Sequence, residues 1–142
     1  MDPLSIATGV ITLASLVTTG LKKAQTLHDA PTEIHALANE VTDLDVVVQE
    51  VVKALQELGK NGSGLSTSEN VSTILGRAQK KLLELDAILN RVLVEDRGTK
   101  KVKYARLIWL RQKSRVEGIR KDLASIKLSL SNLLEAANSW VP

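Results

Sequence analysis

The sequence predicts an all-α protein, folded as an antiparallel up-down four-helix bundle with a short extra helix or a kinked lead-in before the last long helix. Leucine, valine and isoleucine supply 45 of the 142 residues. A chain of this length buries about two-thirds of its unfolded surface, so this apolar material suffices for one core. Eight glycines and three prolines are too few for the regular turns of a β-sandwich. The apolar residues recur at alternating spacings of three and four, the period of an amphipathic helix. We therefore expect residues 1–142 to form a single helical domain.

The first two helices have proline at their starts. Asp2 precedes Pro3, which places an N-cap carboxylate before a proline at the first helical position. The core stripe predicted for this helix is Ile6, Val10, Leu13, Val17, Gly20, Ala24 and Leu27. Pro31 is followed by Glu33 in the predicted first turn of the second helix. Its stripe is Ile34, Leu37, Val41, Leu44, Val48, Val51, Leu55 and Leu58, flanked by Val47 and Val52. The glycine-rich segment 59–64 then predicts a flexible loop.

Capping boxes mark the starts of the last two long helices. Residues 66–69, Ser-Thr-Ser-Glu, and residues 114–117, Ser-Arg-Val-Glu, pair a serine with a glutamate three positions later. The third stripe is Val71, Leu75, Ala78, Leu82, Leu85, Leu89 and Val92, flanked by Leu83 and Ile88. The fourth is Val116, Ile119, Leu123, Ile126, Leu130, Leu133 and Ala137, flanked by Leu128 and Leu134. Residues 97–99 form a tighter break, and residues 101–111 are the expected short helix or kinked lead-in.

The net charge of +3 is distributed unevenly along the chain. Residues 31–70 carry seven acids and two bases, a balance of −5. Residues 97–121 carry ten bases and one acid, a balance of +9. These two segments either complement each other across the bundle or are simply solvated helix faces.

The residue inventory lacks the usual elements of catalytic and cofactor sites. The absence of cysteine excludes disulfides, thiol nucleophiles and thiolate metal ligands, and it fits a reducing compartment. Because the apolar N-terminal stretch lacks a basic leader and a cleavage site, it is not a signal peptide. His28 and His35 bracket a helix junction without further ligands to hold a metal. The segment 59–64 lacks the preceding strand and the Gly-Lys-Ser ending of a phosphate-binding loop. We therefore expect no catalytic, cofactor or metal site.

The segment from Leu4 to Leu21 contains eighteen residues without a formal charge. That length approaches the roughly 20 residues that cross a bilayer core. Its six serines and threonines favour a buried bundle helix over a membrane span. The candidate membrane-inserting residues are Leu4, Ile6, Val10, Ile11, Leu13, Leu16, Val17 and Leu21.

The basic segment contains two of the three aromatic residues of the chain. Cations and aromatic side chains together favour anionic lipid surfaces, and cations also bind nucleic-acid phosphates. No nucleic-acid-binding motif accompanies the segment, so nucleic acid is not the partner we expect. The candidate residues for binding anionic lipid or a partner are Lys100, Lys101, Lys103, Tyr104, Arg106, Trp109 and Arg111. Trp109 is equally consistent with a core or lid position.

The order of motifs resembles one family. The opening Met1-Asp2-Pro3-Leu4-Ser5-Ile6-Ala7, then Asp29-Ala30-Pro31, and the run of Val116, Glu117, Ile119, Leu123, Lys127 and Leu130 behind Trp109 resemble the fungal HeLo-like N-terminal domains. The resemblance implies a helical bundle at the N-terminus of fungal NOD-like receptors and related cell-death proteins. It implies a first helix that is exposed upon oligomerisation and enters the membrane, and it implies no catalytic residues.

Two functions follow as expectations. The first is a non-enzymatic cell-death effector module, part of a longer protein, that oligomerises and targets or permeabilises membranes. The second is an interaction and oligomerisation adaptor of a NOD-like receptor without membrane activity, in which the −5 and +9 segments pair between copies. The expected partners are further copies of the chain, anionic lipids and other domains of the full-length protein. The expected location is the cytoplasm, with recruitment to the plasma membrane on activation.

Overall fold

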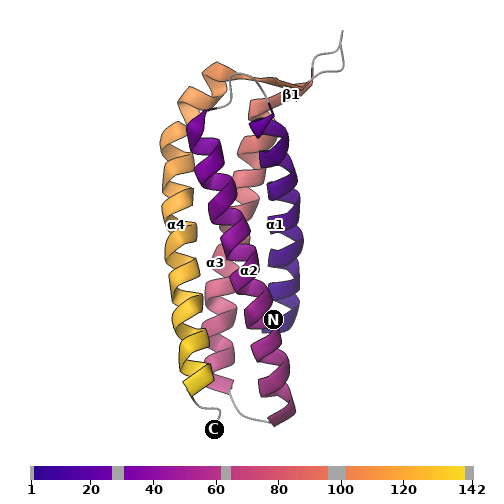
Figure 1. The fold of residues 1–142 in the computed structure, drawn as a ribbon, viewed down its shortest axis with the longest axis vertical. Coiled ribbons are helices and arrows are strands. Elements are labelled where there is room, and N and C mark those ends of the chain that lie inside the picture. Colours follow the sequence, from indigo (N-terminus) through magenta and orange to yellow (C-terminus); the bar gives the residue numbers. More distant parts are fainter. Residues whose placement is uncertain (1, 27–30, 62–64, 96–101, 140–142) are drawn as a thin grey trace.

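The computed structural model describes residues 2–26, 31–61, 65–95 and 102–139. Its elements follow in the order α1 (Pro3–Gln25), α2 (Thr32–Asn61), α3 (Leu65–Val92), β1 (Leu93–Glu95), β2 (Val102–Tyr104) and α4 (Arg106–Ser139). The long helices lie side by side as one elongated bundle (Figure 1). The predicted all-α four-helix bundle is therefore confirmed.

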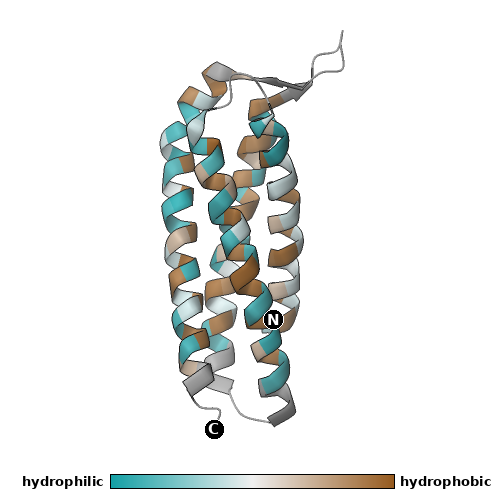
Figure 2. Cartoon of the chain, viewed as in Figure 1, coloured by the Kyte–Doolittle hydropathy of each residue, from teal (hydrophilic) through white to brown (hydrophobic). Residues whose placement is uncertain are grey.

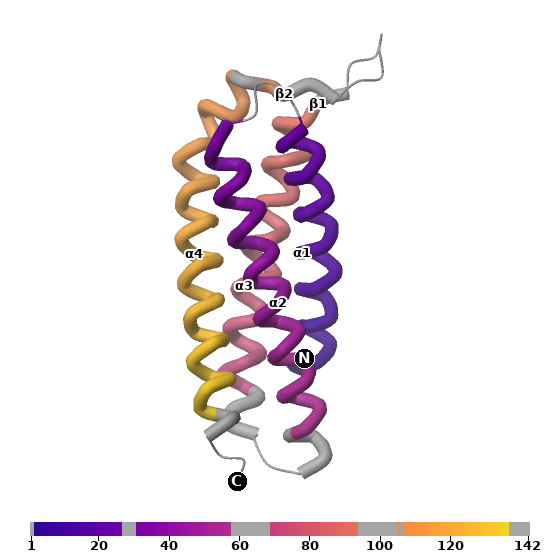
Figure 3. Tube along the Cα trace, viewed as in Figure 1, coloured from indigo at the N-terminus to yellow at the C-terminus, as the bar shows by residue number. Residues whose placement is uncertain are grey.

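The helices alternate in direction, but consecutive helices are not all neighbours. α1 packs mainly on α2 and α3, and α4 packs on the same two helices. α1 and α3 run parallel, because Gly9 lies beside Gln79 and Gly20 beside Leu89. The step from α2 to α3 therefore crosses the diagonal of the bundle, and α2 and α4 become parallel neighbours (Figures 1 and 3). An up-down arrangement with short connections would place α2 beside α3.

The predicted helix starts are observed at α1 and α2. The Asp2 carboxylate accepts a hydrogen bond from the Leu4 backbone N–H at 3.4 Å, and Pro3 opens the helix. Pro31 directly precedes α2, and its carbonyl accepts from the Ile34 N–H at 3.1 Å. α3 begins at Leu65, so the expected capping box at residues 66–69 lies inside its first turns, and Ser66 does not precede the helix. α2 continues to Asn61, so the predicted loop is shorter than 59–64, and residues 62–64 lie outside the described residues.

The segment before α4 differs from the prediction. β1 and β2 pair as an antiparallel hairpin, with Leu93 opposite Tyr104 and Glu95 opposite Val102. The Ala105 N–H donates to the Val92 carbonyl at 2.8 Å, which joins the end of α3 to the start of α4. α4 is one continuous helix from Arg106, and its first turns lean across the end of the bundle (Figure 1). Of the two alternatives for this segment, the separate short helix is wrong, and a lead-in that leans away from the rest of α4 is observed. The expected start at residues 114–117 lies inside α4. The break at residues 97–99 lies outside the described residues.

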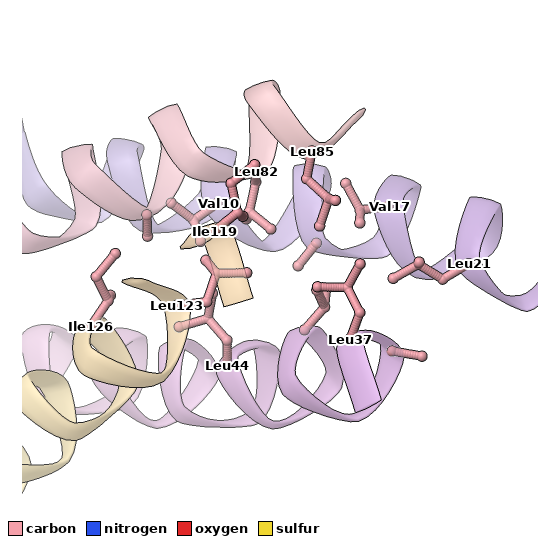
Figure 4. Close-up of a cluster of buried hydrophobic side chains, with 14 of the residues drawn as sticks. Val10, Val17, Leu21, Leu37, Leu44, Leu82, Leu85, Ile119, Leu123 and Ile126 are labelled. Carbon is pink, nitrogen blue, oxygen red and sulfur yellow. The ribbon is translucent and has the colours of Figure 1, made fainter. Parts of the chain in front are cut away.

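One apolar cluster fills the space between the four helices. Figure 4 shows labelled side chains from all four helices pointing toward one another, among them Val10, Leu44, Leu82 and Leu123. All seven stripe residues predicted for α3 are buried. In α1 the core instead contains Ile6, Ala7, Val10, Ala14, Val17, Leu21 and Ala24. Leu13 is only partly buried, and Leu27, Leu58 and Ala137 fall outside the described side chains.

Two of the residues predicted to flank the core are exposed. Leu83 and Leu128 keep 52% and 63% of their surface exposed. Ile88 is buried, and Val47, Val52 and Leu134 are partly buried, as expected. Three-and-four spacing does not show whether a residue beside the stripe faces the core or the solvent. Successive residues of a helix are about 100° apart, so such a residue can lie on either side.

Candidate functional site

The candidate membrane-inserting residues of α1 do not share one face in the bundle. Ile6, Val10, Val17 and Leu21 are buried in the core. Leu4, Ile11 and Leu13 are partly buried, and Leu16 is exposed. In this state the apolar side chains of α1 are therefore largely used in packing against α2 and α3. Entry into a membrane would require α1 to leave both helices.

Three threonines on the outer face of α1 donate their hydroxyl protons to carbonyls of the same helix. Thr8 donates to the Leu4 carbonyl at 2.9 Å, Thr12 to the Thr8 carbonyl at 3.1 Å, and Thr19 to the Ser15 carbonyl at 3.0 Å. Figure 2 shows α1 pale and brown over most of its length, whereas α2 and α4 alternate between teal and brown. Among the described residues, α1 is the one helix long and apolar enough, by length and composition, to cross a membrane. A buried helix of an ordinary bundle meets the same criterion.

Polar contacts attach α1 to the bundle only weakly. Gln25 Nε2 lies 3.2 Å from Nδ1 of the exposed His35 on α2. Among the described residues, no ion pair connects α1 with another helix. Burial of apolar side chains therefore supplies almost all of the attachment of α1.

Charged side chains, in contrast, connect the parallel helices α2 and α4 at two levels. Lys113 Nζ lies 3.1 Å from Glu33 Oε1. Lys127 Nζ lies 2.9 Å from Glu40 Oε1 and 3.8 Å from Asp43 Oδ2. Both lysines lie on the flank of α4 that faces α2. They are fourteen residues apart, and residues of a helix that are seven positions apart lie on nearly the same face, two turns along. The pair of Lys113 and Glu33 joins the predicted basic segment to the predicted acidic segment inside one molecule, whereas Lys127 lies outside residues 97–121.

These contacts shift the titration of the groups involved. The pKa of Glu33 is lowered by a backbone hydrogen bond in the first turn of α2 and by its hydrogen bond to Lys113. The pKa of Glu117 is lowered by the Arg120 guanidinium, whose Nε donates to Glu117 Oε2 at 3.0 Å. On the other side of α4, Lys81 lies 3.1 Å from Asp122, and that hydrogen bond raises the pKa of Lys81. α4 is therefore held to both of its neighbours by charge as well as by packing.

A small cleft lies between α2 and α4 beneath the first of these ion pairs. Its volume is about 290 Å³, and its lining residues are Glu33, Leu37, Trp109, Lys113, Val116, Glu117 and Arg120. The floor is apolar, while the charges at the rim are paired with one another. This lining contains no histidine or hydroxyl that would serve as a nucleophile or a general base.

The structure separates the candidate basic cluster into several parts. Lys103 and Tyr104 lie on β2, Arg106 begins α4, and Arg111 is exposed on α4. Trp109 is only 3% exposed and belongs to the core, which fits its alternative interpretation as a core residue. Lys100 and Lys101 lie outside the described residues.

The prediction missed two exposed leucines beside this cluster. Leu107 and Leu110 keep 74% and 58% of their surface exposed in the first turns of α4. Trp109 and Val116, seven residues apart, mark the buried face of these turns. A helical register drawn through Trp109 and Val116 would have placed Leu107 and Leu110 on the outer side.

Of the two histidines, only His35 is among the described residues, and it lies on α2 beside Gln25. His35 is exposed, and His28 lies outside the described residues. Within the part of the chain that the structure describes, no three histidine, aspartate or glutamate side chains gather in a geometry suited to a metal ion.

Comparison with known proteins places the chain in a family. The family model SesA, described as an N-terminal domain on NACHT NTPases and P-loop NTPases, matches residues 7–127. This match fits the expected N-terminal module of NOD-like receptors, whereas the HeLo-like resemblance is not confirmed. No curated protein and no solved structure matches the chain. The matched segment reaches from the first turns of α1 well into α4, and the chain therefore belongs to the SesA family of N-terminal signalling domains.

Proposed function

We propose that this chain is a non-enzymatic effector module of a fungal NOD-like receptor, close in action to the HeLo-like domains. In this proposal it oligomerises when the attached NTPase is activated, and its first helix then enters the plasma membrane and permeabilises it, which leads to cell death. The observation that carries the proposal is α1, which has no formal charge between Leu4 and Leu21 and is long and apolar enough to cross a bilayer.

The internal hydrogen bonds of α1 support its entry into lipid. A bilayer core offers no partner for unsatisfied polar groups, so a spanning segment must satisfy them itself. Thr8, Thr12 and Thr19 already donate to carbonyls of their own helix. Their hydroxyls would therefore keep the hydrogen bonds that they donate when the helix leaves water.

The way in which α1 is held supports its release. It leaves behind one side-chain hydrogen bond, from Gln25 to His35, and apolar contacts that lipid chains or other copies of α1 would replace. α4, by comparison, would break ion pairs with both α2 and α3. Among the described helices, α1 is thus the one held least by polar contacts, and loss of its apolar packing is the main cost of its release.

The test uses a lysine that the bundle tolerates and a bilayer does not. Thr12 is exposed in the middle of α1, so Thr12→Lys leaves the folded bundle intact. In a membrane a lysine at mid-helix costs about 2.5–3.5 kcal/mol, which corresponds to a roughly hundredfold loss of inserted helix. Leakage of dye from anionic vesicles is the measurement, and circular dichroism verifies folding.

The matched control is Thr42→Lys, the same substitution at an exposed position of α2. We expect leakage to be lost with Thr12→Lys and retained with Thr42→Lys. Equal leakage from both variants would contradict the entry of α1 into the membrane, and absence of leakage from the unchanged chain would contradict permeabilisation altogether.

The complete packing of α1 favours a second candidate function, an adaptor without membrane activity. Seven residues of α1 are buried between α2 and α3, and an adaptor would keep this helix in place. Copies would then associate through exposed charges, with an acid such as Glu50 on α2 meeting Arg111 or Arg115 on α4. Such association weakens as salt screens exposed charges. Sedimentation at low and high salt, combined with the leakage assay, distinguishes the two functions.

A further inference from the structure

We propose that the hairpin end of the bundle docks on anionic lipid headgroups, with Leu107 and Leu110 inserted between them as apolar anchors. This inference rests on the proposed membrane function and adds to it a surface and an orientation. In this orientation the bundle contacts the membrane through the first turns of α4 and the last turns of α1 and α3.

The two leucines are placed as anchors by the register of α4. Trp109 and Val116 face the core, so Leu107 and Leu110 face outward together with Arg111 and Ser114, in the i, i+3, i+4, i+7 pattern of one helix face. A single exposed leucine is ordinary on a protein surface. Here two exposed leucines lie close together on α4, with an arginine beside them. Together they form the apolar and basic face that is typical of helices that lie at a membrane surface.

Cations from three helices gather at the same end of the molecule. Lys22 and Lys23 stand in the last turn of α1 and Arg91 in the last turn of α3. Both of those helices end where α4 begins (Figures 1 and 3). The lysines, Arg91 and Arg111 are exposed. The acid Glu33 at this end is held by Lys113.

This combination favours an anionic bilayer over a protein partner. The cations come from three separate helices and lie around the end of a rod, so together they suit a broad negative surface better than a narrow peptide. Each basic residue near an anionic leaflet strengthens binding about fivefold. The two leucines add to binding only when they enter an apolar medium, which the bilayer beneath the headgroups provides. The alternative negatively charged partner would be the acidic helix α2 of a second copy. In that helix, Glu33 and Glu40 are already paired with α4 of their own chain.

Co-sedimentation with vesicles tests the anchors. The probes are vesicles of phosphatidylcholine with phosphatidylserine and vesicles of phosphatidylcholine alone. The double variant Leu107→Asn/Leu110→Asn should lower binding to the anionic vesicles about tenfold or more, since two apolar side chains no longer leave water. The control Leu128→Asn removes a leucine of similar exposure, 63%, from the opposite half of α4 and should bind as the unchanged chain does.

Two charge-reversal variants test the contribution of the cations independently of the leucines. Arg111→Glu should lower binding to anionic vesicles at least tenfold, because it replaces an attraction by a repulsion. Lys53→Glu changes the net charge equally, but on exposed α2 surface toward the other end of the bundle. It should leave binding nearly unchanged.

The orientation has its own readout, because the chain contains no cysteine. An environment-sensitive fluorophore on Leu107→Cys should shift to the blue on anionic vesicles, while the same label on Leu128→Cys should not.

The outcomes separate this inference from the proposed function. If the leucine variant binds anionic vesicles as well as the control does, docking through this end is overturned, although α1 can still act on membranes. If the variant keeps vesicle binding and loses self-association, the surface serves a second copy of the chain, which also overturns the inference. If the unchanged chain binds no vesicles, the docking and the effector function both fail.

Discussion

Glu40 shows how single charged residues hold this bundle together. Its side chain is only 13% exposed, between α2 and α4, and Lys127 Nζ approaches it to 2.9 Å. A carboxylate so enclosed loses much of its hydration, and because Glu40 Oε1 accepts no hydrogen bond in the described structure, the charge of the nearby lysine is what offsets that loss. The ion pair therefore matters more than the exposed pairs elsewhere on the surface.

Removal of this lysine should destabilise the fold measurably. Lys127→Met keeps the aliphatic stem and leaves Glu40 enclosed without its cation, which we expect to lower the free energy of unfolding by about 1–3 kcal/mol. Lys53→Met removes the partner of Glu50 in an exposed pair and should cost less than about 0.5 kcal/mol. Urea unfolding measures both, and equal losses would show that the enclosed pair has no special role.

Glu33 gives the stability of the bundle a dependence on pH. Because its pKa is lowered in the folded state by the backbone of α2 and by Lys113, the ionised carboxylate stabilises the fold at neutral pH. This contribution is present above the unfolded pKa of about 4.5 and disappears as the pH falls through the lower folded value. Urea midpoints of the unchanged chain and Glu33→Gln should therefore differ at pH 7 and converge in strong acid. A difference that is constant with pH would contradict this assignment.

At the residue scale the sequence predicts the core better than the surface. The stripe of α3 is reproduced because its branched residues alternate with charged ones, so only one face is apolar. α1 has apolar or small residues on most sides, and two overlapping registers fit it equally well. The structure selects Ala14 and Leu21 over Leu13 and Gly20. The exposure of Leu107 and Leu110 was missed for a similar reason, because composition does not show which side of a helix its neighbouring helices cover.

Among the helices, α1 combines the most apolar sequence with two glycines that packing does not require. A Cβ added at Gly9 would lie 3.5 Å from Gln79 Nε2, and one at Gly20 would lie 3.6 Å from Leu89 Cδ1, both ordinary contacts. Each glycine weakens a helix interior by about 0.5–1 kcal/mol relative to alanine. The first helix is thus intrinsically less stable than its packing would allow.

Alanine at these glycines should stabilise the bundle and slow its action on membranes. Gly9→Ala and Gly20→Ala should each raise the free energy of unfolding by about 0.5–1 kcal/mol and should reduce the rate of vesicle leakage. Gly118→Ala on α4 and Gly76→Ala on α3, where nothing lies within 4 Å of the added Cβ, should stabilise the bundle similarly without changing that rate. Equal slowing by all four variants would mean that global unfolding, rather than release of α1, limits leakage.

The hairpin between α3 and α4 is the element that the sequence-based prediction missed. Val94 and Glu95 on β1 and Val102 to Tyr104 on β2 alternate apolar with charged residues around Gly98, which is a weak strand signal. Strands of three residues lie near the lower limit of length. Their pairing depends on the distance between α3 and α4, which local sequence does not encode.

For the molecule as a whole, the order of helices around the bundle decides how charge is distributed. Because α2 and α4 are neighbours, Glu33 of the acidic segment pairs with Lys113 of the basic segment inside the molecule, and Glu40 pairs with Lys127 further along α4. Lys22, Lys23 and Arg91 lie at the end where α1 and α3 finish and α4 begins. The sequence shows the separation of −5 from +9 but not this arrangement, since the crossing between α2 and α3 depends on how the helices pack together.

The position of α1 on a membrane is tested most directly by a single cysteine in a chain that otherwise contains none. Ser15→Cys places a thiol on the exposed face of α1, and Thr42→Cys places one on the exposed face of α2. A water-soluble maleimide should modify both in solution. When anionic vesicles are added, we expect Ser15→Cys to become protected while Thr42→Cys stays reactive, because only α1 enters the bilayer. Continued modification of Ser15→Cys on vesicles that have leaked would contradict the entry of α1 into the membrane.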